Sequence, residues 1–325
     1  MSVVRIFLGI VFFAAAPRVA QAFELDLPLA CEIGKDCWIQ QYANHSAGKE
    51  VQDYQCGGET YSGHDGTDIR VLNTKSDVGV VAAAPGFVVA ARDGVEDRLA
   101  NTPELLRAVI KQECGNGVVV SHEGGYQTQY CHMRRGSIAV KVGDAVKTGS
   151  PLGKVGYSGA AAFAHLHLSL RHGGVKLDPF SGPLVSQCGA GGSSFWSAAA
   201  QKSLAYHSSD LLEFGWANRK LDLNSLENGE TPTGAQPEAS WPALVVYLRA
   251  INLKLGDELH LSLSGPEGIV AQQTLQLDHD KAEYVFSVGK VASDGNWKRG
   301  DYHGQLSIVR NKTMVFDQQI STTMN

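Results

Sequence analysis

Short β-like runs separated by glycines fill the chain from Gly57 to about Pro179. The runs are VGVVAAAPGFVVAAR, GNGVVVSHE, YQTQYCHM, SIAVKVGDAVKTG, PLGKVGYSG and HLHLSLR. Runs of this kind, bounded by turn-forming residues, are typical of strands joined by tight connections. One helix is expected in TPELLRAVIKQE, where Thr102 can cap and Pro103 suits the first turn, although the same stretch could form a long loop. This part of the chain is therefore predicted to be an antiparallel β-sheet protein.

The last run carries two histidines on one face. In HLHLSLR, polar residues occupy positions 165, 167, 169 and 171, and leucines occupy the positions between them. This period of two is that of a half-buried strand, so His165 and His167 point the same way, roughly 6.6 Å apart. Both rings can serve one site while the leucines pack in a core.

The N-terminus has the features of a secretory signal. Arg5 precedes an apolar run from Ile6 to Ala16, and the small-residue triplet of residues 20–22 follows. This predicts a signal peptide over residues 1–22. The apolar run is too short to span a bilayer, so the mature protein should be exported and should not be held in the membrane. The net charge of −5, without a basic cluster, argues against a nucleic-acid partner.

The cysteines also indicate export. The chain has six: Cys31, Cys37, Cys56, Cys114, Cys131 and Cys188. An even number in an exported chain predicts three disulfides, although counting alone cannot choose among the possible pairings. Cys114 and Cys131 are the best-supported pair, because the glycines at 124 and 125 suggest a hairpin turn that brings them together.

Composition divides the mature chain into four parts. A cysteine-bearing segment covers residues 23–56, and the main β domain covers residues 57–198. Residues 199–240, rich in Gly, Ser, Asn and Pro, are expected to be a linker or boundary region. Strand patterning without cysteine resumes in residues 241–325, which predicts a small immunoglobulin-like β-sandwich. It has no recognisable ligand site and could bind a protein partner.

Partners for the histidine pair occur upstream. The segment YSGHDGTDIRV supplies His64 and Asp68 from a glycine-rich loop, whereas Asp65 is expected to face solvent. His132 lies in YCHM, and strand alternation sends Cys131 to the opposite face. Two imidazoles and one carboxylate, with a fourth position open to water, form the ligand set of a catalytic zinc site. Spare histidines beside it suit proton transfer. Strand geometry does not decide which of the two histidines at 165 and 167 is the ligand.

The segments HDGTD, YCHM and HLHLSL resemble the signatures of the lysostaphin-type zinc metallopeptidases, which cut peptidoglycan peptides. The intervening runs follow that family's order over roughly residues 57–180. The resemblance implies an all-β, antiparallel peptidase core and one Zn²⁺ bound by His64, Asp68 and His167. It also implies that His132 and His165 are the catalytic histidines.

The expected function is therefore that of an exported zinc endopeptidase that hydrolyses peptidoglycan peptides by metal-activated water. Cross-links between stem peptides are the leading substrate. Disulfides and a signal without a lipobox cysteine suit a Gram-negative periplasm.

Two other functions are compatible with this set of residues. The first is a non-catalytic binding module or activator of other wall hydrolases with the same fold, whose members lose ligands. No ligand position is missing here. The second is the iron(II) oxygenase triad, which also uses two histidines and a carboxylate. The segment spacing and the spare histidines favour zinc. The remaining histidines, among them His122 and His172, are assigned no role.

Overall fold

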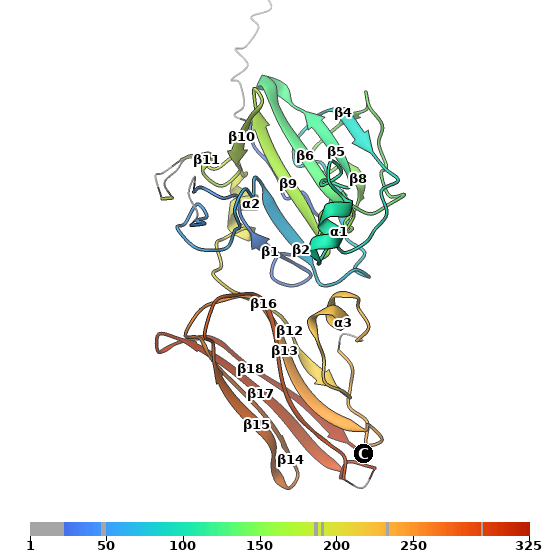
Figure 1. Cartoon of the computed structure of the whole chain (residues 1–325), viewed down its shortest axis with the longest axis vertical. Coiled ribbons are helices and arrows are strands. Elements are labelled where there is room, and N and C mark those ends of the chain that lie inside the picture. The colour runs from blue at the N-terminus through green and yellow to red at the C-terminus, as the bar shows by residue number, and fades with distance from the viewer. Residues whose placement is uncertain (1–22, 47–49, 185–187, 190–191, 232–233, 294) are drawn as a thin grey trace, which may run out of the picture.

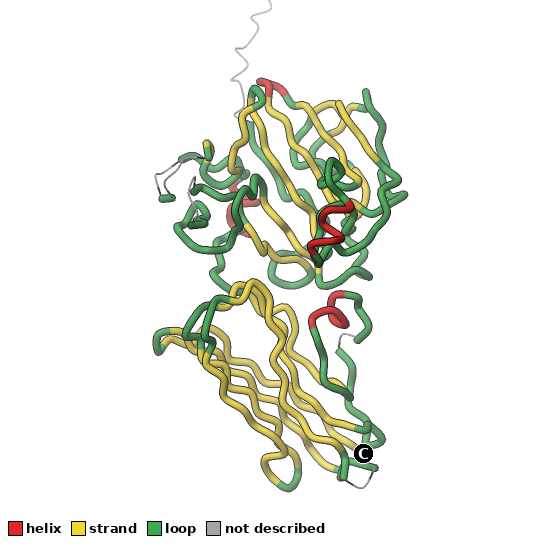
Figure 2. The backbone as a smooth tube through the Cα atoms, in the orientation of Figure 1, coloured by secondary structure: helices red, strands yellow, loops and turns green. Residues whose placement is uncertain are grey.

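The computed structural model describes residues 23–325 except 47–49, 185–187, 190–191, 232–233 and 294. Figure 1 shows two β bodies stacked along the long axis of the molecule. The first body includes every element up to α2 (Ala198–Ser203), and the second begins with β12 (Asp210–Ala217). Strands dominate both bodies, and the helices are few and short (Figure 2). The all-β fold is as predicted, whereas the expected signal peptide lies outside the described residues.

A nine-stranded antiparallel sheet forms the first body. Its strands are β1 (Cys37–Gln41), β2 (Thr67–Val71), β4 (Gly86–Arg92), β5 (Asn116–Ser121), β6 (Tyr126–Met133), β7 (Ala145–Val146), β9 (His165–His172), β10 (Val175–Asp178) and β11 (Gly182–Pro183). Neighbours run in the order β1-β2-β9-β6-β5-β4-β7, and β10 pairs with both β9 and β11. A separate two-stranded sheet joins β3 (Gly79–Val81) to β8 (Pro151–Lys154). The central position of β9 places the histidine pair in the middle of the sheet.

The leucine face predicted for β9 is confirmed, whereas His165 and Ser169 on the polar face are buried as well. Leu166, Leu168 and Leu170 are fully buried in the core of the first body. Leu25 and Leu29 are buried in the same core, and β1 pairs with β2. The N-terminal cysteine-bearing segment is therefore built into the first body.

Three disulfides join all six cysteines, as expected for an oxidising compartment. Cys114 is bonded to Cys131, which confirms the predicted pair. The turn between β5 and β6 contains Gly124 and Gly125, both with positive φ, as the predicted hairpin requires. The other bonds, which the sequence left open, are Cys31–Cys37 and Cys56–Cys188.

The expected helix is present but short. α1 spans Pro103–Ala108, and the Thr102 side chain accepts a hydrogen bond from the Leu105 amide. None of its residues is buried, so it lies on the surface and contributes no side chain to the core. The other helices are the 3₁₀ helix η1 (Glu123–Gly125), α2 (Ala198–Ser203) and α3 (Leu223–Glu227). No helix in the described part of the chain combines the length and apolarity needed to cross a membrane.

The second body is a β-sandwich. Its strands are β12 (Asp210–Ala217), β13 (Ala243–Leu253), β14 (Glu258–Gly265), β15 (Gly268–Gln276), β16 (Lys281–Val291), β17 (Gly300–Arg310) and β18 (Thr313–Met324). Sheets of three and four strands, β12-β13-β16 and β15-β14-β17-β18, enclose one apolar core. The narrower expectation of an immunoglobulin-like sandwich stays a prediction.

The expected linker contributes to this sandwich. Residues 199–240 were predicted to be a boundary region, but β12 pairs with β13 along its whole length and α3 follows it. The strand was missed because DLLEFGWA carries no regular alternation: β12 has a register shift between Leu211 and Glu213. The exact domain limits remain a prediction.

Candidate metal centre and histidine cluster

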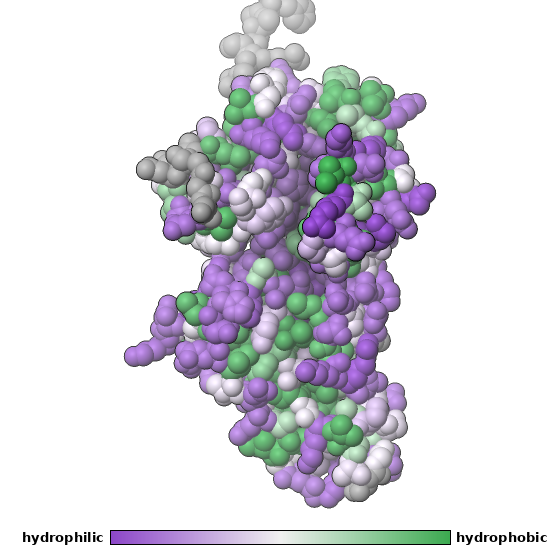
Figure 3. Space-filling model, in the orientation of Figure 1, coloured by the Kyte–Doolittle hydropathy of each residue, from purple (hydrophilic) through white to green (hydrophobic). Residues whose placement is uncertain are grey.

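Three neighbouring strands bring the predicted site residues together. In the β2–β9 register, Asp68 stands opposite His167 and Arg70 stands opposite His165. Residues that stand directly opposite each other in an antiparallel pair project from the same face. β6 flanks β9 on its other side and ends near His132. Figure 3 shows the surface of the first body hollowed beside α1.

His64 lies in the loop before β2, which approaches β9 very closely. A Cβ at Gly66 would be 2.5 Å from the Leu168 carbonyl oxygen and 2.7 Å from the His167 ring. Only glycine permits this approach. The glycine of the HDGTD segment therefore brings His64 over the strand that carries His167.

Three ligand atoms converge at this point. His64 Nε2 lies 3.2 Å from His167 Nδ1 and 3.1 Å from Asp68 Oδ1. His167 Nδ1 lies 2.8 Å from the same carboxylate oxygen. His64, Asp68 and His167 thus form a group that could hold a metal ion.

Hydrogen bonds on the far side of the rings define which nitrogen faces the centre. His64 Nδ1 lies 2.6 Å from the Tyr42 carbonyl oxygen, so Nδ1 donates and Nε2 is left as an acceptor. His167 Nε2 lies 3.2 Å from Asp65 Oδ1 and 3.0 Å from Ser169 Oγ. With that nitrogen donating, His167 Nδ1 is also an acceptor. Two nitrogen lone pairs and a carboxylate therefore face one another, an arrangement that a cation stabilises.

The charges of the buried groups agree with this description. Burial alone would raise the pKa of Asp68, but His64, His165 and His167 hold it well below its usual value. Burial alone would lower the pKa of His167, but its bonds to Asp65 and Asp68 outweigh burial and raise the pKa to about 9. The centre is anionic enough to attract a proton when no metal is bound, and a metal ion would replace that proton.

His132 and His165 lie beside the three ligand atoms with their rings 4.6 Å apart. Their Nδ1 atoms donate to backbone carbonyl oxygens of Ser158 and Phe163, each at 2.8 Å, which leaves both Nε2 atoms as acceptors. Burial, the largest cause, lowers the pKa of both rings. Both are neutral at physiological pH, the state in which an imidazole can take up a proton.

His132 reaches the site through an unusual backbone conformation. Its φ is 61°, in the left-handed region that a non-glycine residue rarely adopts. Simple alternation was expected to separate Cys131 from His132, but Cys131 stands opposite His167 in the β6–β9 register and the His132 ring lies 5.9 Å from that of His167. The left-handed residue breaks the alternation, so both lie near the site. The conclusion that Cys131 is a disulfide residue stands.

Asp65 does not simply face solvent, as was expected. Its carboxylate contacts His167 Nε2 on one side and the Lys176 ammonium on the other, and its side chain is 25% exposed. The hydrogen bond from His167 holds the pKa of Asp65 well below its usual range. The sequence could not reveal this contact, because HDGTD alone does not show that the turn folds back over β9.

Tyr61 is a second neighbour that the sequence did not suggest. Its ring stacks on His64 with centroids 4.4 Å apart, and it is 48% exposed. Other histidines serve elsewhere: His45 contacts the buried carboxylate of Asp178 at 2.7 Å, and His122 lies 2.8 Å from Thr128 Oγ1. Neither belongs to the histidine cluster formed by His64, His132, His165 and His167.

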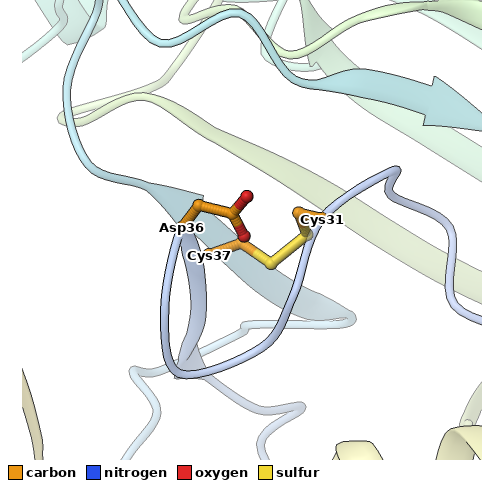
Figure 4. Close-up of side chains that lie close together, drawn as sticks. All are labelled: Cys31, Asp36 and Cys37. Carbon is orange, nitrogen blue, oxygen red and sulfur yellow. A yellow bond between two sulfur atoms is a disulfide. The ribbon is translucent and has the colours of Figure 1, made fainter.

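A second group of potential ligands is found at Cys31, Asp36 and Cys37. Figure 4 shows the two sulfur atoms joined to each other. A disulfide offers no thiolate, and the thiolate is the form of cysteine that binds metals. The His64, Asp68 and His167 group is therefore the better metal site among the described residues.

Fold and site together define an all-β domain built around a potential metal centre with two further histidines. Residues 62–179 match the family described as Peptidase family M23. This match confirms the lysostaphin-type resemblance of residues 57–180.

Two curated relatives share part of this domain. An uncharacterized metalloprotease of Buchnera aphidicola is 35% identical over 63 residues, which cover 19% of this chain and 16% of the relative. The peptidoglycan DD-endopeptidase ShyC of Vibrio cholerae is 32% identical over 90 residues, covering 28% of this chain and 18% of the relative. The match thus spans less than a fifth of either relative.

A solved structure is also similar in part. The catalytic domain of the antimicrobial peptidase lysostaphin from Staphylococcus simulans is 25% identical, with a TM-score of 0.27. The similarity covers 36% of this chain and 75% of the solved chain.

Proposed function

We propose that the protein is an exported zinc endopeptidase that hydrolyses peptide bonds of peptidoglycan, most directly stem-peptide cross-links in a Gram-negative periplasm. The convergence of His64 Nε2, Asp68 Oδ1 and His167 Nδ1 is the observation that carries the proposal. The family match and the similarity to a peptidoglycan endopeptidase support the substrate. The disulfides support an oxidising compartment.

Zinc fits the donor set. Nitrogen and oxygen ligands of tetrahedral zinc lie about 2.0–2.2 Å from the metal, so two ligand atoms lie roughly 3.3 Å from each other. The three separations here are 3.2, 3.1 and 2.8 Å. Three protein ligands leave the fourth position of a tetrahedral site open, as in catalytic zinc sites.

His132 and His165 can supply the proton transfers. Zinc, when bound, would supply a Lewis acid that polarises the peptide carbonyl. His132 and His165 present unprotonated Nε2 atoms, which can accept the proton released by the attacking water. The protonated ring can then donate to the leaving amine as the C–N bond breaks. A charged ring would also stabilise the negative charge that develops on the carbonyl oxygen.

Digestion of purified sacculi tests the proposal. The mature protein is loaded with zinc, its metal content is measured by elemental analysis, and the released fragments are weighed by mass spectrometry. New amine and carboxyl ends within the peptides are expected, and the His167→Ala variant should give none. Intact sacculi with zinc bound would contradict the proposal and favour a binding module or an activator of other hydrolases.

A further inference from the structure

The second body reaches the catalytic strand through one buried carboxylate. Glu227, at the end of α3, is 5% exposed. Its Oε1 accepts a hydrogen bond from the Ala164 amide at 2.7 Å. Ala164 directly precedes His165, the first residue of β9. A side chain from the second body therefore contacts the backbone that carries a histidine of the site.

The contacted amide belongs to the peptide group that holds the His165 ring. His165 Nδ1 donates to the Phe163 carbonyl oxygen at 2.8 Å. The Phe163 carbonyl and the Ala164 amide are the two ends of a single planar peptide group. Glu227 thus accepts from one end of this group while His165 donates to the other. Rotation of the peptide plane would break both hydrogen bonds.

Two arginines hold the carboxylate in place. Glu227 Oε2 lies 2.8 Å from Arg70 Nη2 and 2.5 Å from Arg249 Nη2, and both arginines are fully buried. Arg70 also lies over the Phe163 ring at 5.1 Å, and that ring stacks on His165 with centroids 4.3 Å apart. The peptide group and the aromatic ring next to His165 are therefore both held by the same ion cluster.

We infer that Glu227 is a positioning residue for His165, acting through the Phe163–Ala164 peptide group. A charged acceptor at the amide polarises the peptide and makes its carbonyl oxygen a stronger acceptor for Nδ1–H. This fixes the tautomer that presents Nε2 to the site. The second body is then part of the catalytic unit. The inference rests on the proposed peptidase function for its kinetic consequences, but its structural part does not.

Glu283 provides a matched control. It lies on β16, and its carboxylate contacts Arg70 at 3.1 Å and Arg249 at 2.6 Å, so it pairs with the same two arginines. Among the described residues, no hydrogen bond or ion pair links Glu283 to residues 163–165. Glu227→Gln and Glu283→Gln thus remove the same charge from the same cluster, and only the first acts at the peptide group.

The two variants are compared by kinetics on a peptidoglycan peptide. Glu227→Gln should lower kcat by about 10- to 100-fold with little change in KM, and zinc content should be unchanged. Glu283→Gln should stay within about 2-fold of wild type even if its Tm falls equally. Equal losses of kcat in both variants would overturn the inference.

A second measurement is independent of activity. In wild-type protein the Ala164 amide should exchange slowly with solvent, and the His165 Nδ1–H proton should be visible by NMR. Both signals should change in Glu227→Gln and persist in Glu283→Gln. Fast Ala164 exchange in wild type would overturn the inference even if the variant does not fold. Inactive wild-type protein with these signals intact would count against the peptidase function alone.

Discussion

The two histidines of β9, His165 and His167, differ in which ring nitrogen faces the site. His167 directs Nδ1 to His64 and Asp68, because its Nε2 is engaged by Asp65 and Ser169. His165 uses Nδ1 for the Phe163 carbonyl and keeps Nε2 for the site. The side chains share a face but differ in their hydrogen bonds, so replacing each by alanine is expected to have a different effect.

The first prediction concerns this pair. His167→Ala removes one of the three proposed zinc ligands and should lose both bound zinc and activity. His165→Ala should keep zinc and lose roughly 10²- to 10⁴-fold in rate, since it removes a proposed proton-transfer group. Zinc stoichiometry after dialysis, measured beside turnover, checks both. If His165→Ala loses the metal while His167→Ala keeps it, the roles are reversed.

The second prediction concerns Asp65. Its contact with His167 Nε2 orients a proposed metal ligand, so Asp65→Ala should weaken zinc binding by about 10- to 100-fold. Competition with a chelator measures the affinity. Lys176→Ala, which removes the other partner of Asp65, is the control and should have a smaller effect. Unchanged affinity in Asp65→Ala would show that the carboxylate does not orient the ring.

At the scale of elements, the disulfides tie together segments of very different separation. The bonded cysteines are 6, 17 and 132 residues apart in the sequence. All three lie in the first body, and the second body has no cysteine. Their contributions to stability should therefore differ with the length of the loop that each closes.

The third prediction ranks them. The chain-entropy account gives about 2, 3 and 5 kcal/mol for loops of these lengths. Replacing both cysteines by alanine should thus destabilise the first body least for Cys31–Cys37, more for Cys114–Cys131 and most for Cys56–Cys188. Urea unfolding measures each loss. Equal losses for the three pairs would contradict this ranking.

The sequence predicted elements with regular patterns and missed those without them. The alternating pattern predicted β9. The glycine turn predicted the hairpin of β5 and β6 and the Cys114–Cys131 bond. β12 was missed because its register shift interrupts the alternation. The five histidine and aspartate positions came from local segments, whereas Asp65 and Glu227 depend on contacts between distant segments. Such contacts leave no local pattern.

At the scale of the whole molecule, the two bodies share a buried polar interface. Arg249 of β13 donates to the Leu72 carbonyl oxygen at 2.8 Å, and Asn252 donates to the Gln40 carbonyl oxygen at 2.9 Å. Arg249 also forms a buried ion pair with Glu227. Removing one partner of such a pair is costly, because the other charge stays buried without compensation. The bodies are therefore expected to behave as one unit at neutral pH.

The fourth prediction is that acid weakens this interface. Burial alone would raise the pKa of Glu283, but Arg70 and Arg249 hold it below its usual value. A lowered carboxyl pKa stabilises the fold fully above the unfolded value, about 4.3, and that contribution is lost as the pH falls through the folded value. Tm should therefore fall as the pH drops below about 5. Glu283→Gln should show a shallower fall, and an equal slope would contradict the assignment.

The disulfide pattern also bears on the order in which the chain acquires its bonds. Cysteines that emerge N-terminus first and pair with their nearest successor would join Cys56 to Cys114 and Cys131 to Cys188. The native bonds are nested instead, with Cys114–Cys131 enclosed by Cys56–Cys188. Cys56 must therefore stay reduced until Cys188 is available, or it must first form a non-native disulfide that thiol–disulfide exchange then replaces. Recombinant yield should then be limited by isomerase capacity more than by oxidant.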